Sequence, residues 1–175
     1  MNEGLGQAVV FDELYTPRNA IEPLLKYISK DKRIILPFDT ENSLYYIILK
    51  ENGYNVTCQH LKDNKDFFFE FYDEYDLIIS NPPYSIKDVI LERLYLIDKP
   101  FIMLLPLTAL SGIKRVGMFK KYGIDLIVFD KRINYIIRGE QSKGNWFASA
   151  YFTYKVLKEK LIFEELGENI KCKKK

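Results

Sequence analysis

The sequence has few of the residues that build disulfide frameworks and metal sites. Its 175 residues include two cysteines, Cys58 and Cys172, and one histidine, His60. Two cysteines do not make a disulfide scaffold, and one histidine does not supply the ligand cluster of a structural zinc site. We therefore expect no bound metal.

Long apolar runs are also missing. The longest strongly apolar stretch, residues 101–110, is interrupted by Pro106 and is about half of the ~20 residues that a membrane-spanning helix needs. The N-terminal residues 1–15 lack the charged region and the continuous apolar core of a secretion signal. We therefore expect a cytoplasmic protein that does not cross a membrane.

Neither sign of charge dominates, since 26 Lys and Arg stand against 24 Asp and Glu, for a net charge of +2. The distribution is uneven. Residues 114–143 carry eight basic and three acidic residues, and residues 168–175 carry four lysines and one glutamate. The remainder of the chain is acidic, so a surface suited to phosphate groups is confined to these two segments.

Short apolar runs alternate with helical patterns, as in an α/β sheet covered on both faces. Residues 18–30 have helical apolar spacing with a turn or kink at Pro23, and Ser43 is placed to cap a helix over residues 44–51. A third helix is expected after Ser85, with Ile86, Val89, Ile90, Leu94 and Ile97 on one face. The expected strands are residues 33–37, 55–60, 77–80, 101–105, 125–129 and 147–155. Right-handed crossovers make a doubly wound parallel sheet the default, and the last run suits a buried or antiparallel position.

The most distinctive stretch is an apolar strand that leads directly into Asn81-Pro82-Pro83-Tyr84. Two successive prolines hold Asn81 extended at the carboxyl end of that strand, where open α/β sheets bind ligands. The Asn81 side-chain oxygen and the Pro82 carbonyl could both accept hydrogen bonds from one NH₂ group, while Tyr84 could stack on a planar substrate. The set suits a planar amine or amide, and the alternative is a rigid turn without chemistry.

With this motif the sequence resembles the amino-methyltransferases, S-adenosylmethionine-dependent enzymes that carry (Asp/Asn/Ser)-Pro-Pro-(Tyr/Phe/Trp) after the fourth strand. It is most similar to the small phage-type adenine-N6 methyltransferases. The resemblance implies an α/β, Rossmann-like methyltransferase fold: a doubly wound, mostly parallel sheet of about seven strands with an antiparallel last strand. It assigns residues 15–158 to this domain, after an N-terminal extension (1–14) and before a C-terminal extension (159–175) with a Lys-rich tail.

The resemblance also implies a binding site for S-adenosylmethionine. Tyr15-Thr16-Pro17 resembles the segment that closes over the methionine end of the cofactor, and Pro37-Phe38 resembles part of the Asp-Pro-Phe cofactor loop. Asp66-Phe67 stands where the family has the acidic and aromatic pair that contacts the adenine ring. The expected cofactor-binding residues are Tyr15, Thr16, Pro37, Phe38, Asp39, His60, Asp66, Phe67 and Asn81.

The cofactor loop departs from the family pattern. Residues 37–43 contain no glycine, whereas the family's loop has small residues that let the backbone approach the cofactor. Asp39 or Asn42 could instead contact the methionine amine or the backbone. The acidic residue expected after the second strand is replaced by Gln59-His60, so His60 is expected to hydrogen-bond a ribose or the chain. Between Asp66 and Asn81 the spacing fits a third strand element followed by the fourth strand.

The implied reaction is direct, in-line methyl transfer to the exocyclic N6 amino group of adenine in DNA, with RNA as a further possibility. The catalytic residues would be Asn81, Pro82, Pro83 and Tyr84. Phosphate groups could be followed by basic residues of the 114–143 segment, for which the alternative is an ordinary solvated face. These residues are Lys114, Arg115, Lys131, Arg132, Arg138 and Lys143.

Two further interpretations stay open. The same motif serves protein-glutamine methylation, because a side-chain amide also presents a planar NH₂ group. Alternatively, the domain could have lost turnover and act as a binding or interaction module, as the glycine-free loop and the missing ribose acid would suggest. Almost no chain remains for a target-recognition domain, so sequence specificity should be low, short or supplied by a partner protein.

Overall fold

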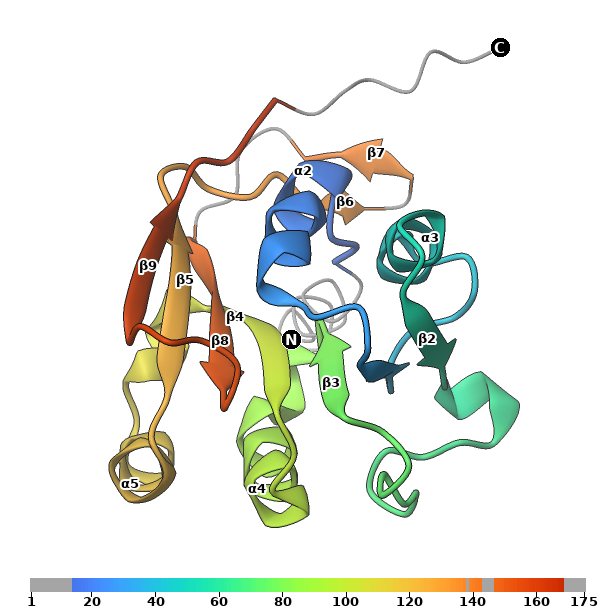
Figure 1. The fold of residues 1–175 in the computed structure, drawn as a ribbon. Helices are drawn as coiled ribbons and strands as arrows, with labels where there is room; N and C mark the ends of the chain where they lie inside the picture. The colour runs from blue at the N-terminus through green and yellow to red at the C-terminus, as the bar shows by residue number, and fades with distance from the viewer. Residues whose placement is uncertain (1–13, 138, 143–146, 169–175) are drawn as a thin grey trace, which may run out of the picture.

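One seven-stranded sheet forms the centre of the computed structural model, which describes residues 14–137, 139–142 and 147–168 (Figure 1). The strand order is β2-β1-β3-β4-β8-β5-β9. The strands are β1 (Arg33–Leu36), β2 (Asn55–Cys58), β3 (Leu77–Ser80), β4 (Phe101–Pro106), β5 (Asp125–Phe129), β8 (Ser149–Tyr154) and β9 (Leu161–Glu164). A separate antiparallel pair is formed by β6 (Ile136–Ile137) and β7 (Glu140–Gln141).

The sheet is mostly parallel. Strands β2, β1, β3 and β4 are parallel neighbours, and β9 is parallel to β5. Strand β8 lies between β4 and β5 and is antiparallel to both, with a register that runs from Phe101 opposite Tyr154 to Pro106 opposite Ser149. The antiparallel strand expected within residues 147–155 is therefore confirmed.

Helices cover both faces of the sheet. Figure 1 shows α2 (Arg18–Ile21) and α3 (Leu44–Glu51) on one side, and α4 (Lys87–Ile97) and α5 (Ile113–Tyr122) on the other. Short 3₁₀ helices complete the set: η1 (Glu22–Tyr27), η2 (Leu61–Asp63), η3 (Tyr84–Ile86) and η4 (Leu107–Leu110). The fold is thus the doubly wound α/β class that the sequence predicted, consistent with a Rossmann-like methyltransferase fold.

Helix α3 has the limits that its sequence predicts. The Ser43 side chain accepts a hydrogen bond from the Tyr46 backbone N–H at 3.2 Å, which satisfies one of the free donors of the first turn. After Asn52, Gly53 adopts a φ of +75°, a left-handed conformation that costs a glycine little. The Ser43 cap places the start of α3 directly after the loop that follows β1, and Gly53 follows its end.

The other two predicted helices differ in detail. The segment expected at residues 18–30 is a short α2 followed by the 3₁₀ helix η1, with Pro23 at the change. Helix α4 begins at Lys87, after the turn η3, and no side chain caps it. Ile86 lies in η3 ahead of the helix, and Val89 lies in α4 outside its buried face. They are 40% and 45% exposed, contrary to the predicted apolar face. The buried positions of α4 are Ile90, Leu91, Leu94 and Tyr95.

Two strand predictions also change. No strand forms in residues 61–76, where a third strand element was expected, and the chain passes through η2 and turns to reach β3. Strand β9 was not predicted, and it extends the sheet past the expected boundary at residue 158.

Within the described residues, no helix is long and apolar enough to cross a membrane. The same part of the chain contains no group of three or more His, Cys, Asp or Glu that could hold a metal ion.

Candidate functional site

A cavity of about 510 Å³ opens at the carboxyl ends of β1, β2 and β3, a volume in the range of small-molecule sites. Each strand contributes residues from the loop that follows it. The first turn of α3, the segment before α2 and the region of β6 and β7 complete the wall. The lining residues are Leu14, Tyr15, Thr16, Phe38, Asp39, Asn42, Ser43, Leu44, Tyr45, His60, Lys62, Asn81, Ile136 and Gly139. The sheet thus brings together six of the predicted site residues: Tyr15, Thr16, Phe38, Asp39, His60 and Asn81.

Asn81 has one half of its amide fixed and the other half without a partner. Its Nδ2 donates a hydrogen bond to the Leu14 carbonyl at 2.5 Å. Its Oδ1 is buried and has no hydrogen-bond partner among the described residues. A buried acceptor left unsatisfied is costly, so this oxygen fits the N–H group of a ligand in the cavity.

Asp39 is a half-buried carboxylate on the same wall. Its Oδ2 accepts a hydrogen bond at 3.2 Å from the hydroxyl of Ser80, which is fully buried at the end of β3. Burial raises the pKa of Asp39 to about 6, and the hydroxyl groups of Ser43 and Ser80 oppose this rise because they favour the charged form. Near neutral pH the cavity therefore contains a carboxylate that would gain from a cationic partner.

The segment before α2 is tied across the cavity by its backbone. The Tyr15 N–H donates to the Ile136 carbonyl at 3.0 Å, and the Ile136 N–H donates to the Tyr15 carbonyl at 2.8 Å. Thr16 is buried, whereas the Tyr15 side chain is 60% exposed. Together with the Leu14 carbonyl bound by Asn81, these bonds hold residues 14–16 against the site. Leu14 and Ile136 act here through their main chains, a role that no motif in the sequence indicates.

His60 makes a hydrogen bond to the chain, which is one of the two roles expected for it. Its Nδ1 accepts from the Lys62 N–H at 3.1 Å and caps the 3₁₀ helix η2. The imidazole still lines the cavity, as does Lys62, which no motif in the sequence indicated.

Three residues expected to bind the cofactor do not line the cavity. Pro37 is buried directly after β1. The Asp66 carboxylate accepts a hydrogen bond from the Phe68 N–H at 3.0 Å and so shapes the local turn. Phe67 is buried, and its ring centroid lies 4.9 Å from that of Phe38. Phe67 therefore supports a wall residue and does not face the cavity.

The remaining three residues of the Asn81 motif also lie off the cavity wall. Tyr84 is 7% exposed, and its hydroxyl is 2.9 Å from that of Tyr135, which in turn donates to Ser149 at 2.8 Å. The Tyr84 ring also meets Phe147 edge-on, with centroids 6.1 Å apart. The structure thus places this ring in the core, in contrast to the expected stacking surface. Pro82 is buried and Pro83 is half-buried.

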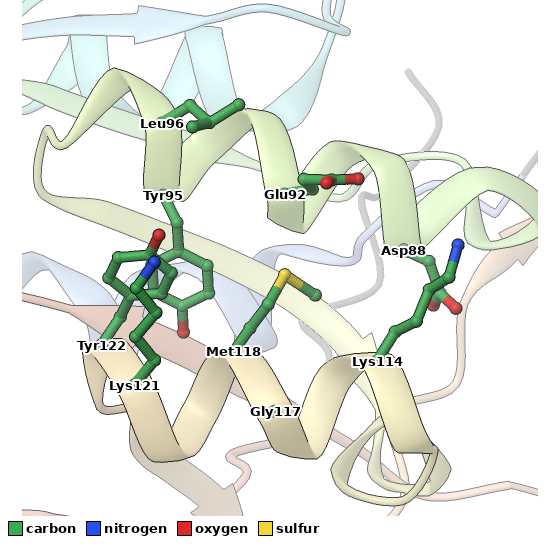
Figure 2. A pocket seen from close by; sticks show the side chains of 9 residues that line it. All are labelled: Asp88, Glu92, Tyr95, Leu96, Lys114, Gly117, Met118, Lys121 and Tyr122. Atoms are coloured by element: carbon green, nitrogen blue, oxygen red, sulfur yellow. The ribbon is translucent and has the colours of Figure 1, made fainter.

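The predicted phosphate-binding residues do not form one surface. Lys114 lies in a groove between α4 and α5 (Figure 2), whereas Lys131 and Arg132 line a separate cavity of about 420 Å³ with Asn19 and Asn134. Arg138 and Lys143 lie outside the described residues.

Arg115 corrects the expectation of a phosphate contact. Its guanidinium donates to the Ala109 carbonyl at 2.8 Å and also binds the Ser111 carbonyl and the Asp88 carboxylate. The Arg115 side chain is only 14% exposed. These contacts join the start of α5 to α4, and they hold the guanidinium within the chain through all three of its nitrogens.

Comparison with known proteins gives only remote similarities. The chain matches no protein-family model and no curated protein sequence. One similar solved structure is described as a predicted O-methyltransferase from Agrobacterium tumefaciens, with 12% identity, a TM-score of 0.47, and coverage of 81% of this chain and 83% of that one. Another is the modification subunit assigned to a type I restriction enzyme of Vibrio vulnificus, with 12% identity and a TM-score of 0.47. That match covers 93% of this chain, which spans about half (49%) of the Vibrio chain.

Proposed function

We propose that this chain is an S-adenosylmethionine-dependent methyltransferase that methylates the N6 amino group of adenine in DNA. The observation that carries the proposal is Asn81 at the carboxyl end of β3, which lines the cavity and whose buried Oδ1 has no hydrogen-bond partner among the described residues. An acceptor in that position suits the amino hydrogen of a planar NH₂ group.

The residues of the cavity fit the cofactor. The pKa of Asp39, raised to about 6, leaves a carboxylate near neutral pH that can hold the α-ammonium group of a methionine moiety. Phe38, backed by Phe67, offers a ring beside it. The glycine-free loop is not strained, since no residue from 37 to 43 has a positive φ. Here a glycine would relieve no backbone strain, so the conformation of the loop does not depend on one.

When bound, S-adenosylmethionine supplies an activated methyl group on a sulfonium. The residues of the chain would align the target amine with this methyl group. By accepting a hydrogen bond from the target amine, Asn81 would draw the nitrogen toward tetrahedral geometry and direct its lone pair. The amino hydrogens become more acidic as positive charge develops on the nitrogen, so the Asn81 acceptor would bind the transition state more strongly than the ground state.

The target adenine, which accepts the methyl group, must reach the cavity without its base-pair partner. In a DNA duplex the adenine would be flipped out of the stack, which costs a few kcal/mol, whereas a single strand avoids this cost. We assign the flanking phosphates to Lys131 and Arg132, basic residues after β5 that line the separate cavity of about 420 Å³.

A second candidate, methylation of a protein glutamine, is favoured by the same atom. The Oδ1 of Asn81 could accept from a side-chain amide as well as from adenine. The two candidates share the cofactor and differ in the acceptor, so one assay with several acceptors separates them.

The proposal is tested with Asn81→Ala. S-adenosylmethionine binding is measured by calorimetry, and labelled methyl transfer is measured to duplex DNA, single-stranded DNA, RNA and glutamine-containing protein. We expect wild type to bind the cofactor and to label DNA, and the variant to lose about 100-fold or more in rate while staying folded.

The matched control is Asn55→Ala, which removes an exposed amide from the start of β2, at the amino ends of the strands and away from the cavity. It should behave as wild type. Labelling of protein alone would establish the second candidate. A wild-type chain that binds no S-adenosylmethionine at millimolar concentration would contradict both.

A further inference from the structure

The outer side of α4 and α5 forms a groove of about 380 Å³, on the face of the sheet opposite α2 and α3 (Figures 1 and 2). In Figure 2, Asp88 and Lys114 lie at one end of the groove and Tyr95, Tyr122 and Lys121 at the other. None of these residues takes part in the site at the carboxyl ends of the strands, so the groove calls for a separate explanation.

The two walls of the groove carry opposite charges. Helix α4 contributes Asp88 and Glu92, and helix α5 contributes Lys114 and Lys121. Asp88 binds Arg115, but among the described residues neither Glu92 nor Lys114 forms an ion pair. Lys121 lies over the neighbouring Tyr122 ring, 4.7 Å from its centroid. A glutamate on one wall and lysines on the other are thus available to an external partner.

Apolar side chains accompany these charges. Leu96 lines the groove and is 70% exposed, and Ile113 at the start of α5 is 96% exposed. The rings of Tyr95 and Tyr122 stack at the same end as Leu96, with centroids 4.8 Å apart. Apolar groups grouped with charged residues on an exposed face are typical of protein-protein contact sites.

Gly117 gives the middle of the groove an open floor. Glycine weakens a helix relative to alanine, yet a Cβ atom at Gly117 would meet nothing within 4 Å. Among the residues that the structure describes, no contact therefore requires glycine at this position. A helix turn without a side chain lets a helix of another molecule approach closely. Gly117 could therefore serve a contact with a second molecule.

We propose that the groove is the contact surface between two copies of this chain. A two-fold axis would place α4 of one copy on α5 of the other, so that the acidic wall meets the lysine wall twice. The pattern is self-complementary, and it needs no partner of different charge. Nucleic acid suits the groove poorly, because phosphates would face Asp88 and Glu92. The inference does not depend on the proposed methyl transfer.

The test is sedimentation of the full chain over a range of concentrations. Wild type should form a dimer, and Leu96→Asp should weaken dimerisation by about tenfold or more. The matched control is Leu61→Asp, since Leu61 is 68% exposed but lies in η2, away from the groove. It should dimerise as wild type. Both positions are on the surface, and circular dichroism verifies the fold of each variant.

Charge reversal identifies the contact as intermolecular. Glu92→Lys reverses the acidic wall, and Lys114→Glu with Lys121→Glu reverses the basic wall, so each variant alone should lose the dimer. Mixed in equal amounts they should dimerise again, because the reversed position 92 of one copy then faces the reversed positions 114 and 121 of the other, while Asp88 stays paired with Arg115 within its own chain. Lys158→Glu, at an exposed lysine before β9, should change nothing.

A wild-type chain that stays monomeric at every concentration reached would overturn the proposal. It would also be overturned if the mixture of the two reversed variants stayed monomeric, or if the lysine-wall variant lost DNA binding while the dimer persisted.

Discussion

At the scale of single residues, the two polar groups that define the cavity depend on partners far away in the sequence. Asn81 is oriented by the carbonyl of Leu14, 67 positions earlier, and Asp39 is held by Ser80, 41 positions later. The prolines after Asn81 fix its backbone, but the Leu14 carbonyl determines which half of its amide is bound within the chain and which half is left without a partner among the described residues. Spacing within a motif does not reveal such contacts, so the motif predicted the residue but not its orientation.

Asp39 should make cofactor binding depend on pH. Burial raises its pKa to about 6, and a methionine ammonium requires the ionised form. We expect the affinity for S-adenosylmethionine to be constant above about pH 7 and to fall by up to about tenfold per unit below about pH 6. Asp39→Asn should weaken binding at neutral pH and remove this dependence. Calorimetry at several pH values measures both effects, and an unchanged pH profile in the variant would contradict the assignment.

The same shift predicts the sign of a stability change. Between the ordinary pKa of 3.8 and the raised value of about 6, the folded chain binds more protons at Asp39 than the unfolded chain does. The contribution of Asp39 to stability is therefore lost as the pH rises through about 6. Asp39→Asn should unfold at a higher temperature than wild type near pH 8, and this gain should disappear near pH 4. Thermal unfolding at the two pH values provides the measurement.

At the scale of elements, the first turn of α3 links the fold to the site. Ser43 caps this helix and also supports Asp39, while Leu44 and Tyr45 line the cavity. The Tyr45 hydroxyl is anchored in the core, 2.9 Å from that of Tyr151 on β8. A change at this cap should therefore affect both the helix and the cavity.

Ser43→Ala should destabilise the chain by about 1 kcal/mol, because it removes the acceptor for a free N–H of the first turn. Ser43→Thr keeps a capping hydroxyl and should recover most of the loss. Urea unfolding of the two variants measures the difference. Equal stability of Ser43→Ala and wild type would show that the cap contributes nothing.

Elements whose signals are local could be predicted from the sequence. Residues 44–51 carry a cap, an apolar periodicity and a glycine stop, and α3 has these limits. Strand β9 has four residues of alternating exposure at the edge of the sheet, between charged neighbours, so its pattern is weak. Tyr84 and Arg115 were placed at sites by their residue types. Their partners Tyr135 and Asp88, which are distant in the sequence, hold Tyr84 in the core and Arg115 between α4 and α5.

At the scale of the whole molecule, the basic residues of the 114–143 segment divide between two faces. The groove between α4 and α5 contains Lys114 and Lys121, and the cavity near α2 contains Lys131 and Arg132. The net charge of +5 in this part of the sequence therefore does not describe one continuous basic surface.

Lys131→Gln with Arg132→Gln should weaken binding to duplex DNA. The slope of log affinity against log salt should decrease by about 2 if each side chain holds one phosphate. Fluorescence anisotropy at several salt concentrations gives this slope. Lys158→Gln removes one exposed charge elsewhere and should leave the slope unchanged. An unaltered slope in the double variant would place the DNA on another surface.

The position of β8 also has a consequence for synthesis on the ribosome. Residues 149–154 form a strand between β4 and β5, so a nascent chain that ends before residue 149 exposes the facing edges of both. Unpaired edges invite association with other chains, and the central sheet can close only after residue 154 has left the exit tunnel. Chains released before that point should therefore be targets for chaperones.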